Sequence, residues 1–158
     1  MIQEDIEAFA AALPAHRAIL ALDLGTKTIG VAASDALLSS ANPVETIKRR
    51  KFGLDAARVL EIADTRAAAG LILGLPRNMD GSEGPRCQST RAFARNLAGL
   101  TDLPITFWDE RLSTVAAERA LIEADLTRKR RSEVIDAVAA AYILQGALDR
   151  LRHLRAAT

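Results

Sequence analysis

The 158-residue sequence has little cysteine, histidine or aromatic side chain. The single cysteine, Cys87, cannot form an internal disulfide, and one cysteine with two histidines is too few for a zinc cluster. With one tryptophan, one tyrosine and four phenylalanines, the chain is not expected to offer an aromatic platform on which bases stack. Any chemistry must therefore come from other side chains.

Long hydrophobic runs and a strong net charge are also missing. No apolar run approaches the length of a membrane span, and the acidic start Glu4, Asp5 and Glu7 does not suit a signal peptide. A composition of 49% hydrophobic and 26% charged residues is typical of a globular domain, and the length suits one domain. We therefore expect a single domain in a reducing cytoplasm.

The net charge of +1 argues against a globally basic nucleic-acid binder. The positive charge is instead concentrated in two runs, Lys48-Arg49-Arg50-Lys51 and Arg128-Lys129-Arg130-Arg131, both expected in connections between regular elements. Such runs either hold phosphates or form solvated surface, and the sequence leaves both interpretations open.

Hydrophobic patterning predicts an α/β domain. After an N-terminal helix the expected order is strand, strand, strand, helix, strand, helix, strand, helix, helix. The first two strands should form a hairpin, and a polar loop at 74–85 should be functional. The expected strands are 18–22, 29–34, 44–47, 71–73 and 104–108; the expected helices are 3–13, 52–69 with Gly70 as its stop, 86–97, one after Ser113-Thr114, and 132–151.

Carboxylates stand at the ends of two of these strands. Asp23 follows the apolar run 19–22, and Asp109 and Glu110 follow 105–108. Open α/β sheets bind their ligands outside the carboxyl ends of the strands, so these acids should converge if the two strands are neighbours.

A further acid, Asp136, lies in the last expected helix. Positions three, four and seven residues later are Ala139, Ala140 and Ile143, so its helix face is small and apolar. A buried carboxylate is costly unless paired, and clustered carboxylates raise one another's pKa values. A divalent cation reverses that effect, so the pattern predicts a metal site.

Each acid also has an ordinary structural explanation. Asp23 could be a turn residue before Leu-Gly, and Asp109-Glu110 could be the acidic start of a helix. Asp136 could pair with a basic residue across a groove, such as Arg111.

Four segments, in this order, resemble motifs of the YqgF (RuvX-like) family: 21–32 (ALDLGTKTIGVA), 73–84 (LGLPRNMDGSEG), 109–114 (DERLST) and 135–140 (IDAVAA). The resemblance spans 17–151, which makes 1–16 a helical extension to a core of 17–151 within one domain, 1–158. It implies an RNase H-like fold, with a mixed central sheet flanked by helices. Members are described both as Holliday junction resolvases and as pre-16S ribosomal RNA nucleases, descriptions that differ in substrate.

The resemblance also implies roles for residues. Asp23 and Asp136 correspond to metal-binding acids, whereas the acid that related resolvases carry before the second helix is replaced by Gly74-Leu75-Pro76. Asp109 or Glu110 must supply the third ligand, and we favour Asp109 because it is nearer the strand end. The implied mechanism is in-line hydrolysis of a phosphodiester with two Mg²⁺ or Mn²⁺ ions.

The expected phosphate-binding residues follow from the same comparison. Lys27 and Arg111 are candidates for the scissile phosphate. The flanking backbone would be held by the 77–84 loop, with Arg77 and Asn78, and by Arg128, Lys129, Arg130 and Arg131.

Two other classes of function stay open. A binding module could keep the fold without catalysis, and the segment Asp23 to Thr28 also resembles the phosphate-binding hairpin of actin-like kinases. The sequence does not decide between branched DNA and ribosomal RNA precursor as the nucleic-acid partner, or between a monomer and a homodimer.

Overall fold

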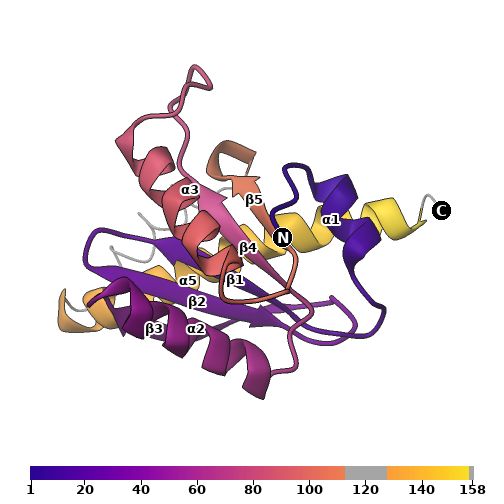
Figure 1. Cartoon of the computed structure of the whole chain (residues 1–158), viewed down its shortest axis with the longest axis horizontal. Coiled ribbons are helices and arrows are strands. Elements are labelled where there is room, and N and C mark those ends of the chain that lie inside the picture. The colour runs from indigo at the N-terminus through magenta and orange to yellow at the C-terminus, as the bar shows by residue number, and fades with distance from the viewer. Residues whose placement is uncertain (113–127, 157–158) are drawn as a thin grey trace.

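A five-stranded mixed sheet runs through the molecule. The structure is a computed structural model that describes residues 1–112 and 128–156. Within 128–156 it describes side chains from residue 135 onward. The strand order is β3-β2-β1-β4-β5 (Figure 1). The first three strands are antiparallel neighbours, and the last two run parallel to β1. The strands are β1 (Ile19–Leu24), β2 (Thr28–Ser34), β3 (Ala41–Lys48), β4 (Gly70–Leu75) and β5 (Ile105–Asp109).

Helices cover both faces of this sheet. Figure 1 shows α2 (Phe52–Thr65) and α3 (Pro85–Ala98) in front of the sheet and α5 (Arg128–Ala156) behind it. The short α1 (Ile6–Ala12) packs beside α5, and a 3₁₀ turn, η1 (Glu110–Leu112), follows β5. The expected mixed sheet flanked by helices is thus confirmed. Among the described helices, none is both long and apolar enough to cross a membrane.

The side chains of β1 alternate between two hydrophobic cores. Leu20, Leu22 and Leu24 pack with α2 and α3, whereas Ile19 and Ala21 pack with α5. Because neighbouring residues of a strand point to opposite faces, Asp23 lies on the α5 face. It is 4% exposed, at the carboxyl end of a strand that is otherwise apolar.

The expected stop of the second helix is wrong. Helix α2 ends at Thr65, Ala67 adopts a φ of 52°, and Gly70 is the first residue of β4. A Cβ on Gly70 would lie 2.7 Å from the ring of Phe9, so this glycine makes room for α1. Its role is therefore packing rather than helix termination.

Other boundaries also differ from expectation. Strand β3 begins at Ala41, and α5 runs from Arg128 to Ala156 where the sequence predicted 132–151. The basic run at 128–131 is consequently the first turn of a helix, not a connection. Its side chains, like the helix expected after Ser113-Thr114, lie outside the described residues.

Helix α5 crosses β2 at Gly30, where the two backbones nearly touch. A Cβ on Gly30 would lie 1.9 Å from the carbonyl oxygen of Asp136 and 2.1 Å from its carbonyl carbon. Neither atom belongs to a flexible side chain, so the contact can be relieved only by moving the helix. Glycine at position 30 therefore sets how closely α5 approaches the sheet.

Gly30→Ala should destabilise the fold by about 1–3 kcal/mol, the usual cost of overpacking, because α5 must move away from β2. Gly53→Ala is the matched control, since a Cβ there has open space in helix α2 and alanine is the better helix former. Urea denaturation of both variants measures the difference. Equal stabilities would show that α5 does not depend on the glycine.

Candidate functional site

Asp23 and Asp136 approach each other on the α5 face. Asp23 pairs with Gly30 across the β1–β2 ladder, and the backbone of Asp136 lies over Gly30. The hydroxyl of Thr28, two residues earlier in β2, donates a hydrogen bond to the carboxylate of Asp136. The structure thus brings together the two acids that the sequence placed at a strand end and on a helix face.

Strands β1 and β5 are not neighbours, because β4 lies between them. The condition under which we expected their terminal acids to converge directly is therefore not met. Glu110 nevertheless reaches over the intervening strand: its Oε1 lies 3.1 Å from the position that a Cβ on Gly74 would occupy. Ile143 of α5 contacts the same position, so Glu110 lies on the α5 face. Gly74 is one residue beyond Leu73, the partner of Leu22, and so lies beside Asp23.

Asp109 lies on the other face of the sheet. In β5, Ile105 and Phe107 pack with the α2/α3 core and Trp108 with the α5 core, so Asp109 points away from α5. Arg111 holds its carboxylate with a side-chain contact of 2.7 Å and a backbone N–H bond of 2.9 Å. Arg77 lies 3.8 Å from the same carboxylate.

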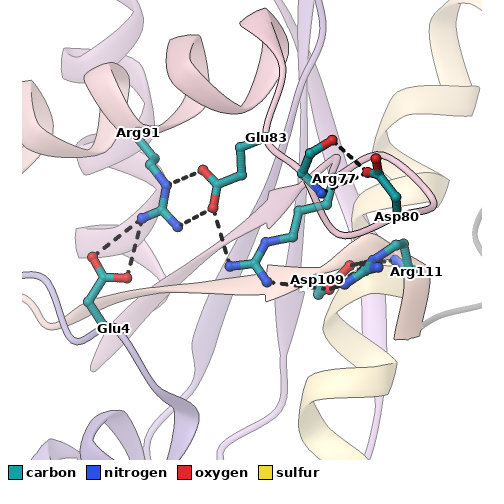
Figure 2. Close-up of polar contacts among 8 residues, drawn as sticks. Glu4, Arg77, Asp80, Glu83, Arg91, Asp109 and Arg111 are labelled. Carbon is teal, nitrogen blue, oxygen red and sulfur yellow. Dashed lines mark hydrogen bonds and ion pairs between the residues drawn. The ribbon is translucent and has the colours of Figure 1, made fainter.

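A chain of ion pairs extends from Asp109 along this face, as Figure 2 shows. Arg77 also contacts Glu83 at 3.3 Å, Glu83 accepts from Arg91 at 2.6 Å, and Arg91 reaches Glu4 at 3.3 Å. The network ties the 76–84 loop to β5, α3 and the N-terminal segment. The hydrogen bond from Arg111 holds the pKa of Asp109 below its ordinary value, and that from Arg91 does the same for the pKa of Glu83.

The predicted phosphate-binding residues fall into two groups. Lys27 is exposed in the β1–β2 turn, beside the strand end that carries Asp23. Arg77 and Arg111 are engaged in the ion pairs above, and the side-chain amide of Asn78 donates to Ser82 within its own loop. The side chains of the run at 128–131 are outside the described residues.

The sequence did not predict how Thr28 and Gly74 serve this site. Thr28 lies inside the first motif, but only the α5 crossing brings its hydroxyl to Asp136. Gly74 was noted for lacking a carboxylate, whereas its missing side chain is what admits Glu110.

The donor set on the α5 face consists of carboxylates. In the described part of the chain, no group of three or more His, Cys, Asp or Glu side chains is close enough together to hold a metal ion. Asp23, Glu110 and Asp136 belong to three elements that lie together at the carboxyl end of β1, but their carboxylates are not gathered into one group in this structure. Carboxylate oxygens are the ligand type that Mg²⁺ and Mn²⁺ prefer, so the chemistry of the set fits such an ion.

Solved structures with the same fold are resolvases. RuvC of Thermus thermophilus, in complex with a Holliday junction substrate, matches with a TM-score of 0.56 and 16% identity, covering 87% of this chain and 97% of that one. The yeast mitochondrial Holliday junction resolvase Ydc2 matches with a TM-score of 0.51 and 11% identity, covering 96% and 87%. The chain thus shares the fold of these Holliday junction-binding proteins.

The chain belongs to the RuvX family, whose description is Holliday junction resolvase and whose pattern matches residues 17–150. The resemblance stated from the four motifs is therefore confirmed. A relative from Ruegeria pomeroyi is 73% identical over 98% of this chain and 100% of its own length. One from Roseobacter denitrificans is 72% identical over 99% and 97%. Both carry the name "Putative pre-16S rRNA nuclease".

Asp109→Asn should destabilise the fold in a pH-dependent way. Because the pKa of Asp109 is lower in the folded chain, its ionised form stabilises the fold above the ordinary carboxyl pKa of about 4. This contribution is lost as the pH falls through the lowered folded pKa. We expect a loss of about 1 kcal/mol at pH 7 that shrinks toward zero as the pH falls below the lowered pKa of the folded chain.

Asp149→Asn is the matched control, since its pair with Arg152 is on the surface and its side chain is 59% exposed. Surface pairs contribute little, so its effect should stay below about 0.5 kcal/mol. Denaturation at several pH values compares the variants. A pH-independent loss in Asp109→Asn would show that its ion pairs are not the cause.

Proposed function

We propose that this protein is a divalent-metal-dependent nuclease whose active site is formed by Asp23, Glu110 and Asp136. The observation that carries the proposal is that the three elements carrying these acids converge on the α5 face at the carboxyl end of β1. Our sequence-based preference for Asp109 as the third ligand is reversed here. Asp109 serves instead to hold Arg111, and with it the η1 turn that carries Glu110.

The geometry around Gly74 supports this choice of Glu110. Related resolvases carry an acid at the end of the strand that corresponds to β4, and in this chain that strand has Gly74 there. The Glu110 carboxylate fills the space that a side chain at position 74 would take. One acid is thereby supplied from the neighbouring strand end instead of from β4 itself.

Asp23, Glu110 and Asp136 would hold Mg²⁺ or Mn²⁺, two ions in the mechanism that the family implies. Such ions supply an activated water and stabilise the charge on the leaving oxygen of a phosphodiester. The chain's own residues position the ligands: Thr28 orients the Asp136 carboxylate, and Gly30 fixes its distance from β1. Burial of Asp23 excludes bulk water from one side of the site.

The relatives' names favour pre-16S ribosomal RNA as the substrate, and we propose its 5′ end as the site of cleavage. Resolution of Holliday junctions is the second candidate, favoured by the family description and the solved structures. A homodimer suits a junction, where two strands must be cut, whereas a monomer suffices to trim one RNA end. We place the activity in the cytoplasm and in one domain, 1–158, with its core at 17–151.

The predicted phosphate-binding residues differ in how readily they could contact the substrate. Lys27 is exposed beside the carboxylates and would contact the scissile phosphate. Arg111 and Arg77 would reach a phosphate only by exchanging a carboxylate partner, and Asn78 by opening its bond to Ser82. Arg128, Lys129, Arg130 and Arg131, at the start of α5, would hold flanking backbone.

Asp23→Asn, Asp136→Asn and Glu110→Gln should each lower cleavage at least a hundredfold, because each removes a charged metal ligand. Asp109→Asn should lower it about tenfold or less. The assay is cleavage of end-labelled precursor ribosomal RNA and of a synthetic four-way DNA junction, side by side, with Mn²⁺, Mg²⁺ or EDTA.

The outcome also chooses among the candidate functions. Cleavage of one substrate, abolished by EDTA, identifies that substrate. Full activity in Glu110→Gln with none in Asp109→Asn would restore Asp109 as the ligand. Binding without any cleavage would favour a non-catalytic module, and neither binding nor cleavage would favour the actin-like alternative.

Mn²⁺ should also raise the melting temperature of the wild-type protein, because a ligand that binds only the folded state stabilises it by mass action. An excess of about 100 times the dissociation constant corresponds to about 2.7 kcal/mol. Asp23→Asn and Asp136→Asn should lose this shift, whereas Asp149→Asn should keep it. A shift of equal size in all four proteins would place the bound ion elsewhere.

A further inference from the structure

A cavity of about 550 Å³ opens on the α2/α3 face at the same end of β1. It lies between the β1–β2 turn, the connection from β3 to α2, and the first turns of α3. The residues that give it its chemistry are Gly25, Thr26, Arg49, Arg50, Arg86 and Ser89. Arg49 and Arg50 belong to the basic run at 48–51, which the sequence left open as phosphate-binding or solvated surface, and none of the six residues contributes a carboxylate to the active site.

The cavity carries a concentrated positive charge. Three arginines line it, and no acidic side chain is among its described lining residues. Arg49 donates to the carbonyl oxygen of Gly25 at 2.7 Å, and Arg86 contacts that of Leu24 at 3.5 Å. A carbonyl oxygen is neutral, so these contacts orient the guanidinium groups without cancelling their charge.

Other arginines of the molecule differ in this respect. Arg58, Arg91 and Arg111 each contact a carboxylate within 3 Å. Within the part of the chain that the structure describes, Arg49, Arg50 and Arg86 form no ion pair. The cavity therefore brings together three arginines whose charge no carboxylate of the described residues neutralises.

The position of Arg49 is fixed by packing. Its guanidinium lies 5.9 Å from the ring centroid of Phe93, which packs edge-on against Phe52 at 5.2 Å. An arginine that is held in place loses less conformational entropy when it binds an anion. Thr26 and Ser89 add exposed hydroxyl groups at the rim. Guanidinium and hydroxyl groups are typical hydrogen-bond donors to phosphate oxygens.

We propose that this cavity binds a backbone phosphate of the nucleic-acid substrate, away from the scissile one. The inference rests on the proposed function, because the same strand would have to reach the carboxylates. Asp23 and Leu24 are consecutive residues on opposite faces of β1, so the cavity and the active site flank one strand end. A nucleic-acid strand that crosses the β1–β2 turn contacts both.

The lining favours a backbone phosphate over a free nucleotide. No aromatic ring is among its described lining residues to stack a base, and no carboxylate to hold a ribose hydroxyl or a nucleotide's Mg²⁺. The available donors recognise phosphate alone. Sequence-independent contact with the backbone is what such a set provides.

The test compares two double variants that remove the same charge. R50A/R86A removes two cavity arginines, and R66A/R95A removes two exposed arginines outside it. Binding of a fluorescent single-stranded precursor RNA and of a four-way DNA junction is measured in EDTA by anisotropy, at several salt concentrations. R50A/R86A should weaken binding about tenfold or more and reduce the slope of log K against log salt by about 0.7 for the single strand and about 0.9 for the junction, as expected for one lost phosphate contact.

R66A/R95A should change the affinity less than about twofold. An affinity and slope for R50A/R86A equal to those of this control would overturn the proposal. So would calorimetric binding of ATP or inorganic phosphate that R50A/R86A abolishes while its RNA affinity stays wild-type, because the cavity would then be a mononucleotide site.

The measurement is independent of cleavage, so the two proposals can fail separately. Asp23→Asn should lose cleavage but keep the wild-type salt slope. If Asp23→Asn still cuts, the proposed active site is wrong, and the slope of R50A/R86A still decides the cavity. Circular dichroism melting of each variant checks that the fold is retained.

Discussion

The approach of α5 to β2 at Gly30 is the contact on which the rest of the site depends. Two backbones can lie this close only where one residue has no side chain, because a Cβ would meet a carbonyl group that cannot move aside. The crossing places Asp136 beside Thr28 and across from Asp23. It thereby places two acidic residues on one face beside an otherwise apolar layer, where a bound cation would favour their ionised forms.

A second glycine extends this arrangement across the sheet. Because β4 separates β1 from β5, an acid at the end of β5 reaches β1 only if the strand between them offers space. Gly74 offers it, and Glu110 fills it. Adjacent residues at this strand end point to opposite faces of the sheet. Asp109 therefore joins the ion pairs of the α2/α3 face, whereas Glu110 lies on the α5 face. Both glycines act here through the volume they leave free.

The net charge is only +1, but acidic and basic side chains lie on different faces of the sheet at the end of β1. Acidic residues lie on the α5 face at the end of β1, and three arginines line a cavity on the opposite face at the same end. Other arginines, namely Arg77, Arg91 and Arg111, form ion pairs that hold the 76–84 loop in place. A polyanion can therefore be bound at one end of β1 by a protein whose composition is not basic, because the arrangement of charges matters more than their sum.

The sequence by itself determined the order of the described elements, the strand end at Asp23, the apolar helix face around Asp136 and the family, because these depend on local patterns and motifs within single segments. Only the tertiary structure decided what each glycine does, where α5 begins and which of Asp109 and Glu110 faces the other acids. Gly70 was taken for a helix stop because its neighbour in space, Phe9, is distant in sequence. The facing of Glu110 likewise depends on β4 lying between β1 and β5 and on α5 packing across them, and strand order and packing partners cannot be read from a segment alone.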